Sequence, residues 1–75
     1  MISHERLRGL LLEILARGSA MRLGAIYEVV KAEPACRGVS YDRVYQVLVE
    51  LEWRDQVKRP SRGYYQLHGN TRTAP

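Results

Sequence analysis

The sequence predicts a small, mainly helical α+β domain in which three helices precede a β-hairpin. Over residues 3–54, apolar side chains recur at intervals of three and four in three separate stretches, which is the spacing of helices with one buried face. After Asp55 they alternate on either side of a turn-forming segment, and a period of two is typical of paired strands. We expect one domain over residues 1–67, followed by a flexible tail over residues 68–75.

The first apolar stripe predicts a helix from Ser3 to about Arg17. Its members recur at i, i+3, i+4, i+7 and i+8, and are Leu7, Leu10, Leu11, Ile14 and Leu15. Ser3 can cap the start, because its hydroxyl oxygen can accept a hydrogen bond from a first-turn amide, and Gly18 can end the helix. We expect a short link over residues 20–22, with an extended segment that can pair with the later hairpin.

A second helix is predicted from Leu23 to about Glu33. Leu23, Ile26, Tyr27 and Val30 repeat the helical spacing. Pro34 should stop this helix, because the residue before a proline is disfavoured in the helical region. Residues 34–39 then form a turn. Its Cys36 is the only cysteine, which excludes an intrachain disulfide, and we interpret it as a small buried or loop residue rather than a reactive thiol.

The third helix should begin after Ser40 and run to about Arg54. Ser40 is a good N-cap, and Asp42 stands in the first turn, where a negative charge is favourable. The buried side is predicted to hold Val44, Leu48 and Leu51, with Val47 beside them.

Trp53, near the end of this helix, is predicted to pack in the core with Tyr27 and Tyr65. The chain contains no phenylalanine, so other aromatic side chains must fill the interior. A base-stacking platform is the alternative for these three residues.

The hairpin is predicted from a change in periodicity. Val57 begins one strand, residues 60–63 (Pro-Ser-Arg-Gly) supply turn chemistry, and residues 64–67 return as the second strand. Tyr65 and Leu67 should lie on its core face.

The sequence lacks the features that would indicate an enzyme. A chain of 75 residues buries only about 60% of its unfolded surface, which leaves little room for a large cleft. No nucleophile signature or Gly-rich phosphate loop is present, and His4, Cys36 and His68 lack metal-ligand spacing. We therefore expect no catalytic site, metal, cofactor or small-molecule ligand. The most apolar run, residues 10–16, is interrupted by Glu13, so we expect no membrane segment and a cytoplasmic protein.

The positive charge is concentrated in the last third of the chain. Residues 1–53 carry seven basic and seven acidic side chains, whereas residues 54–75 carry five basic residues and one acidic residue, which accounts for the net charge of +4. Together with a pI of about 9.6, this clustering favours a polyanionic partner. A basic surface that serves only solubility is the alternative.

Three helices followed by a basic hairpin resemble the winged helix-turn-helix family of DNA-binding proteins, including small PadR-like and Fur-like prokaryotic regulators. The likeness covers roughly Glu5 to Leu67. It is carried by VSYDRVYQVLVELE at 39–52, the strand start at Val57 and RGYYQL at 62–67. The resemblance implies a three-helix winged helix-turn-helix fold in which the third helix enters the major groove and the hairpin, or wing, contacts the DNA backbone.

Two positions depart from that family. Asp55 stands where Gly is usual, and Gln56 stands where an apolar residue is usual. Asp tolerates the left-handed backbone conformation better than most residues, so we expect the turn after the third helix to be kept.

The resemblance implies that the start of the third helix lies at the DNA, at Ser40, Tyr41, Asp42, Arg43, Tyr45 and Gln46. The chemistry suits this role, because Gln can pair with adenine, Arg with guanine and Asp with cytosine, while Tyr can donate to a phosphate. Two alternatives stay open. Tyr45 lies beside the buried rows and can be partly core, and Asp42 can serve only to stabilise the start of the helix.

The wing should supply further contacts. Lys58, Arg59 and Arg62 surround its turn, so their cationic ends can reach a phosphate or the minor groove. A solvated hairpin without a partner is the alternative.

We therefore expect sequence-specific binding to double-stranded DNA and a role in transcription regulation, with a recognition helix over about 40–54 and a basic wing over 57–67. The alternative is a protein interaction adaptor in a larger assembly, for which Leu12, Val29 and Val49 in the charge-neutral part of the chain would provide apolar contacts. A homodimer would have to use the first helix, the hairpin edge or the tail.

Overall fold

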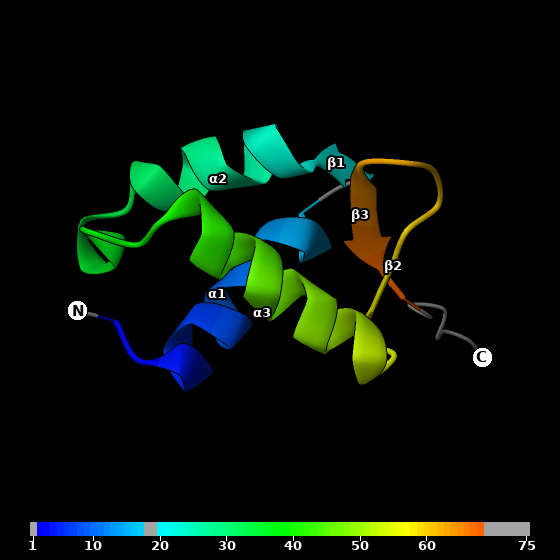
Figure 1. The fold of residues 1–75 in the computed structure, drawn as a ribbon, viewed down its shortest axis with the longest axis horizontal. Coiled ribbons are helices and arrows are strands. Elements are labelled where there is room, and N and C mark those ends of the chain that lie inside the picture. The colour runs from blue at the N-terminus through cyan, green and yellow to red at the C-terminus, as the bar shows by residue number, and fades with distance from the viewer. Residues whose placement is uncertain (1, 18–19, 69–75) are drawn as a thin grey trace.

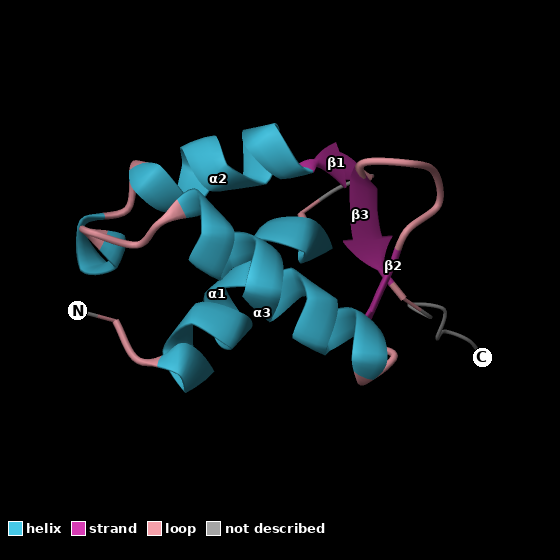
Figure 2. Cartoon of the chain, in the orientation of Figure 1, coloured by secondary structure: helices cyan, strands magenta, loops and turns pink. Residues whose placement is uncertain are grey.

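The computed structural model describes residues 2–17 and 20–68, and shows a small α+β fold of three helices and a three-stranded antiparallel sheet (Figures 1 and 2). The elements in chain order are α1 (His4–Ala16), β1 (Met21–Arg22), α2 (Leu23–Lys31), the short 3₁₀ helix η1 (Pro34–Cys36), α3 (Tyr41–Trp53), β2 (Val57–Lys58) and β3 (Tyr64–Leu67). The predicted α+β class is confirmed. Gly18 and residues 69–75 of the predicted tail lie outside the described residues.

Both predicted serine caps are present. Ser3 precedes α1, and its Oγ accepts a hydrogen bond from the backbone N–H of Arg6 at 3.2 Å. Ser40 precedes α3 in the same extended conformation, and its Oγ accepts from the N–H of Arg43 at 3.1 Å. Each cap satisfies one of the first-turn amides that have no partner within the helix, which explains why both helices begin at the predicted positions.

α2 ends earlier than predicted. It stops at Lys31, and Glu33 has left the helical region with φ −87° and ψ 120°, as expected for a residue before proline. Pro34 then begins η1, which the sequence did not predict, because one short 3₁₀ turn has no apolar repeat of its own. Cys36 at its end is buried, and this burial raises the pKa of the thiol. A thiol that resists ionisation is a poor nucleophile.

α3 ends in a Schellman motif with an aspartate at its left-handed position. The N–H of Asp55 donates to the carbonyl of Glu52, and the N–H of Gln56 donates to that of Leu51, each at 3.0 Å. Asp55 has φ 62°. These bonds satisfy carbonyls at the end of the helix and confirm that Asp55 can replace the glycine usual at this point.

The sheet joins three segments that are distant in sequence. Its strand order is β1-β3-β2, with Met21 opposite Tyr65 and Val57 opposite Leu67. The extended segment expected before α2 therefore pairs with the hairpin as predicted, and the hairpin is the larger part of a three-stranded sheet. Gly63, with φ 80°, adopts the positive φ that the end of the turn requires.

The buried side chains of the described residues form one hydrophobic core between the three helices and the sheet. In Figure 1, α3 runs across the front, α1 crosses behind it, and α1 also packs against β3. The buried residues are Ile2, Leu7, Leu11, Ile14, Leu15, Ile26, Val30, Cys36, Val39, Val44, Val47, Leu48, Leu51, Val57 and Tyr65. The predicted inward stripe of the third helix is thus confirmed, and within the described residues no polar or charged side chain is buried.

The prediction that Trp53 packs in the core is wrong. Its side chain is 83% exposed, whereas Tyr65 is 2% exposed and Tyr27 is partly buried. The physical reason is rotation along α3. Each residue turns the helix by about 100°, so Trp53 lies about 200° around the axis from buried Leu51. The lack of phenylalanine in the sequence does not change this helical geometry, so it was not a sufficient reason to place Trp53 in the core.

A cluster of four polar side chains centred on Glu50 links α1 to α3 through His4 and Arg8. His4 Nε2 donates to Glu50 Oε1, and both Arg8 and Arg54 contact Glu50 Oε2 at 3.1 Å. The hydrogen bond from His4, with the neighbouring arginines, lowers the pKa of the Glu50 carboxyl. This cluster adds a polar connection between two helices that otherwise meet through apolar side chains.

We expect the stability provided by Glu50 to be lost in acid. Its pKa is lowered on folding, so its contribution is present at neutral pH and disappears as the pH falls through the folded-state value. Glu50→Gln should melt at a lower temperature than wild type at neutral pH, with the difference closing once the pH falls below the lowered pKa of Glu50. Glu13→Gln, which removes the same charge from an exposed site on α1, is the control. A gap between wild type and Glu50→Gln that is the same in both pH ranges would contradict this assignment.

Candidate nucleic-acid interface

The outward side of α3, the start of α2 and the loop between β2 and β3 share one face of the molecule (Figure 1). Tyr41 joins these three parts. Its side chain is 48% exposed, and its ring meets that of Tyr27 edge-on, with 5.2 Å between the ring centroids. Tyr41 also lines a hollow with Gly63 and the segment 22–25. The first residue of α3 is therefore adjacent to both the second helix and the wing.

Arg22 completes this corner. It is the N-cap of α2 but provides no side-chain hydrogen bond to the helix, and its guanidinium lies over the ring of Tyr64, 6.0 Å from the centroid. Gly24 and Ala25, in the first turn, are exposed. The amides at the start of a helix favour an anion. The sequence did not predict a role for Arg22, although its place directly before the apolar stripe of α2 marks it as a helix-start residue.

Asp42 and Gln46 form a pair on the most exposed side of α3. They stand one helical turn apart, and Gln46 Nε2 donates to Asp42 Oδ2 at 3.3 Å. Both side chains are exposed, so the pair presents its remaining donors and acceptors to solvent. Asp42 also stands in the first turn of α3, and the structure is thus compatible with both of the roles considered for it.

Tyr45 lies between this face and the wing. It is 40% exposed, which places it at the margin between core and surface. The neighbouring Arg59 is already engaged, because its Nε and Nη2 donate to the two carboxylate oxygens of Glu52 at 3.4 and 3.2 Å. Its guanidinium also lies 5.8 Å from the centroid of the Tyr65 ring. A phosphate would have to compete with Glu52 for Arg59.

Lys58 and Arg62 are the accessible cations of the wing. Lys58 lies on β2 and Arg62 lies in the loop before β3, and both are exposed. Within the described part of the chain neither forms an ion pair. Of the three predicted wing residues, these two have charges that no neighbouring acid neutralises.

Two predicted residues of the third helix do not join this face. The Oγ of Ser40 is occupied in capping α3. Arg43 is partly buried, and its Nη2 donates to the backbone carbonyl of Ile2 at 3.1 Å, which directs the guanidinium towards the start of α1. The spacing within the helix did not indicate this contact, because Ile2 lies 41 residues before Arg43 in the sequence.

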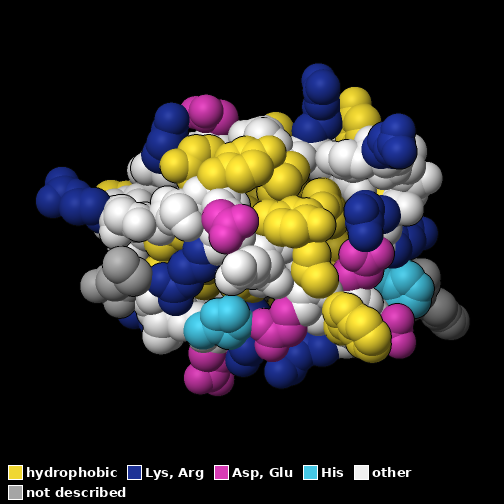
Figure 3. Space-filling view, in the orientation of Figure 1, with side chains coloured by type: hydrophobic (Ala, Val, Ile, Leu, Met, Phe, Trp, Pro, Cys, Tyr) yellow, Lys and Arg dark blue, Asp and Glu magenta, His cyan; other side chains and the backbone are white. Residues whose placement is uncertain are grey.

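Apolar side chains occupy much of the same face. Figure 3 shows a hydrophobic band that runs from α2 towards the end of α3, with lysine and arginine at its margins and acidic residues within it. Among residues 2–17 and 20–68, the large exposed hydrophobic residues are Val29, Tyr41, Tyr45, Trp53 and Tyr64. Three of these five are tyrosines, which combine an apolar ring with a hydroxyl that can donate a hydrogen bond.

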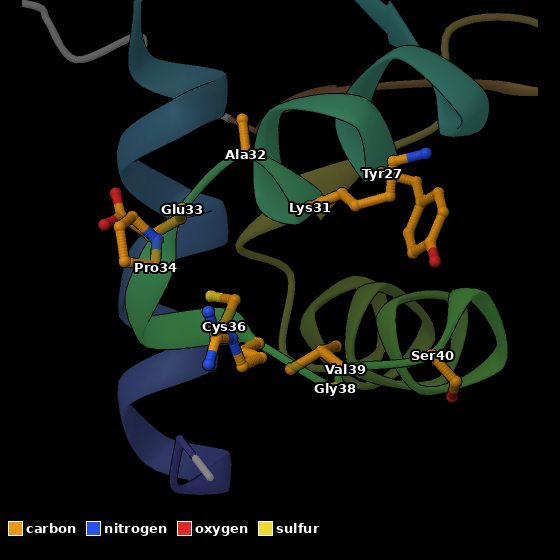
Figure 4. Close-up of a pocket in the computed structure, with 10 residues that line it drawn as sticks. Tyr27, Lys31, Ala32, Glu33, Pro34, Cys36, Gly38, Val39 and Ser40 are labelled. Atoms are coloured by element: carbon orange, nitrogen blue, oxygen red, sulfur yellow. The ribbon is translucent and has the colours of Figure 1, made fainter.

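A second hollow lies between the end of α2, η1 and the start of α3 (Figure 4). The ring of Tyr27 projects from α2 towards α3, and Lys31 and Glu33 add charges to the lining. No buried side-chain nitrogen or oxygen in the described residues lacks a hydrogen-bond partner. Those residues also contain no group of three or more histidine, cysteine or acidic side chains arranged to hold a metal ion.

None of the described helices combines the length and the apolar composition needed to cross a membrane.

Comparisons with protein family models, curated proteins and solved structures found no match to this chain.

Proposed function

We propose that the protein is a winged helix-turn-helix protein that binds double-stranded DNA in a sequence-specific manner and regulates transcription. In this proposal the outward side of α3 enters the major groove, and the wing, residues 57–67, contacts the backbone. The observation that supports it best is the shared position of Tyr41, Arg22 and Gly63 around one hollow. That arrangement lets the starts of two helices and the wing face one duplex.

The arrangement also divides the contacts by their chemistry. In this proposal the exposed side chains of Asp42 and Gln46 reach base edges, whereas those of Arg22, Lys58 and Arg62, which are also exposed, contact phosphates. Phosphate contacts fix orientation and supply salt-dependent affinity, and base contacts supply sequence preference. Arg59 contributes less in this proposal than the sequence alone indicated, because Glu52 already neutralises its charge.

Binding to an arbitrary duplex is expected to be weak and strongly salt-dependent. The test is fluorescence anisotropy with a labelled random-sequence duplex across salt concentrations, in which the logarithm of the binding constant should fall linearly with the logarithm of the salt concentration. No measurable binding at low salt, together with no enriched sequence in a selection from randomised duplexes, would overturn the proposed function.

The wing should account for part of that salt dependence. Replacing Lys58 or Arg62 with alanine is expected to reduce the slope of the salt titration by about 1 for each phosphate that the variant no longer neutralises. Arg59→Ala should change the slope less. Arg6→Ala removes an exposed cation from α1, which lies behind α3, and serves as the matched control. If Lys58→Ala and Arg62→Ala both keep the wild-type slope, the wing does not contact the backbone.

A protein interaction adaptor is the second candidate, and one observation favours it. Trp53 is 83% exposed and lies with Val49 in a hollow at the end of α3, and exposed tryptophan is enriched where protein partners bind. An adaptor would show no affinity for duplex DNA at low salt, whereas a DNA-binding protein should keep its affinity in Trp53→Ala. The same anisotropy titration therefore distinguishes the two functions.

A further inference from the structure

We infer that Asp42 is a positioning residue that fixes the side-chain amide of Gln46 for reading adenine. This inference rests on the proposed DNA binding and adds the base that the recognition helix selects. The two side chains are one turn apart on α3, and Gln46 Nε2 donates to Asp42 Oδ2 at 3.3 Å. Both side chains belong to α3, so substitutions at these two positions can test the pair without changing another element of the fold.

The charge of Asp42 determines which way the amide faces. The two ends of a glutamine amide are nearly identical in shape, and a solvated amide can present either its oxygen or its nitrogen. An ionised carboxylate only accepts hydrogen bonds. The nitrogen of Gln46 must therefore face Asp42, which leaves Oε1 and the second N–H of the amide directed away from it.

The atoms that remain match one base edge in the major groove. Adenine presents the N7 acceptor beside the N6 amino donor, so the free N–H and Oε1 of Gln46 can bind both at once. Guanine presents two acceptors, N7 and O6, which would place an oxygen against Oε1. An amide released from Asp42 could instead turn both of its N–H groups towards guanine. Asp42 thus disfavours the orientation that would accept guanine.

The same carboxylate has a second consequence for binding. Asp42 brings a negative charge towards a phosphate backbone, so it lowers affinity for every duplex while it increases discrimination by Gln46. Removing it should therefore have two opposite effects. Affinity for unrelated duplexes should rise, and the preference for adenine should fall. Removing Gln46 should lower the preference without raising the affinity for unrelated DNA.

The test combines a selection with a double-mutant cycle. Wild-type protein is first used to select a site from randomised duplexes, and the position whose preference is lost in Gln46→Ala is identified. Wild type, Asp42→Ala, Gln46→Ala and the double variant are then titrated with four duplexes that differ only at that base pair. Thermal melts of each variant show that all four proteins remain folded. Glu28→Ala, an exposed acidic residue on α2, is the control for the change in net charge.

Wild type should prefer adenine over guanine by roughly 5- to 150-fold, the range expected for one good bidentate contact. Asp42→Ala should lose most of this preference, and should have no effect on it when Gln46 is already alanine. An adenine preference that survives in Asp42→Ala, or that Asp42→Ala still changes in the Gln46→Ala background, would overturn the positioning role while leaving DNA binding intact. If wild type binds no duplex, the proposed function fails, and this inference fails with it.

Discussion

Leu48→Ala is expected to destabilise the fold by about 2 to 5 kcal/mol, the usual cost of emptying a fully buried leucine site. Leu48 is 0% exposed and stands on the inward stripe of α3. Small domains have only about 5 to 15 kcal/mol of stability in total, so the loss is a large share of it. A thermal melt followed by circular dichroism should show a fall in the midpoint of roughly 10 °C or more.

Tyr41→Ala is the matched control on the same helix. Tyr41 is 48% exposed, and its ring meets that of Tyr27 edge-on, a pair worth about 1 kcal/mol. We expect this variant to stay folded at 25 °C and to bind duplex DNA more weakly. If Tyr41→Ala unfolded the protein while Leu48→Ala left the melting curve unchanged, α3 would be rotated relative to the structure and the proposed interface would face the core.

Tyr65→Ala is expected to have an equally large effect, about 3 to 5 kcal/mol, as is usual for truncating a buried aromatic side chain. Tyr65 is 2% exposed, and it is the residue of β3 that pairs with Met21 of β1. Its loss should therefore loosen the attachment of the sheet to α1 as well as leave a cavity. Chemical denaturation with urea gives the free energy of unfolding directly.

Trp53→Ala provides the contrast for Tyr65→Ala, because it removes a still larger aromatic side chain from the surface. Substitutions at such exposed sites usually change stability by no more than about 0.5 kcal/mol. Tyr65→Phe, which keeps the ring, should stay close to wild type. A large loss of stability in Trp53→Ala would show that the tryptophan packs in the core as the sequence suggested, against its exposed position in the structure.

Local features of the fold could be predicted because their causes lie within a few residues. Ser3 and Ser40 cap helices through amides three positions away, Pro34 acts on its neighbour, and Asp55 needs only its own tolerance of a positive φ. The inward stripe of α3 also follows from spacing alone. Each of these features depends only on residues that are close in the sequence, so it can be predicted without knowing the tertiary fold.

The electrostatic partners in the candidate site could not be predicted in the same way. Arg59 and Glu52 meet because the chain reverses after α3, and Arg43 meets the carbonyl of Ile2 from the other end of the chain. Such contacts depend on tertiary arrangement. The residue types and the charge clustering indicated a basic wing, but only the fold distinguishes Lys58 and Arg62 from an arginine already held by an acid.

The pairing of β1 with β3 also determines when the fold can be completed during synthesis. Met21 leaves the ribosome 44 residues before its partner Tyr65. Until β3 has emerged, the nascent chain lacks the strand that joins β1 to β2 and packs against α1. Pairings between such distant residues form late, because closing the intervening loop costs entropy before any pairing is gained. The helices can form and begin to pack as they emerge, but the part of α1 that packs against β3 stays uncovered until residues 64–67 are released.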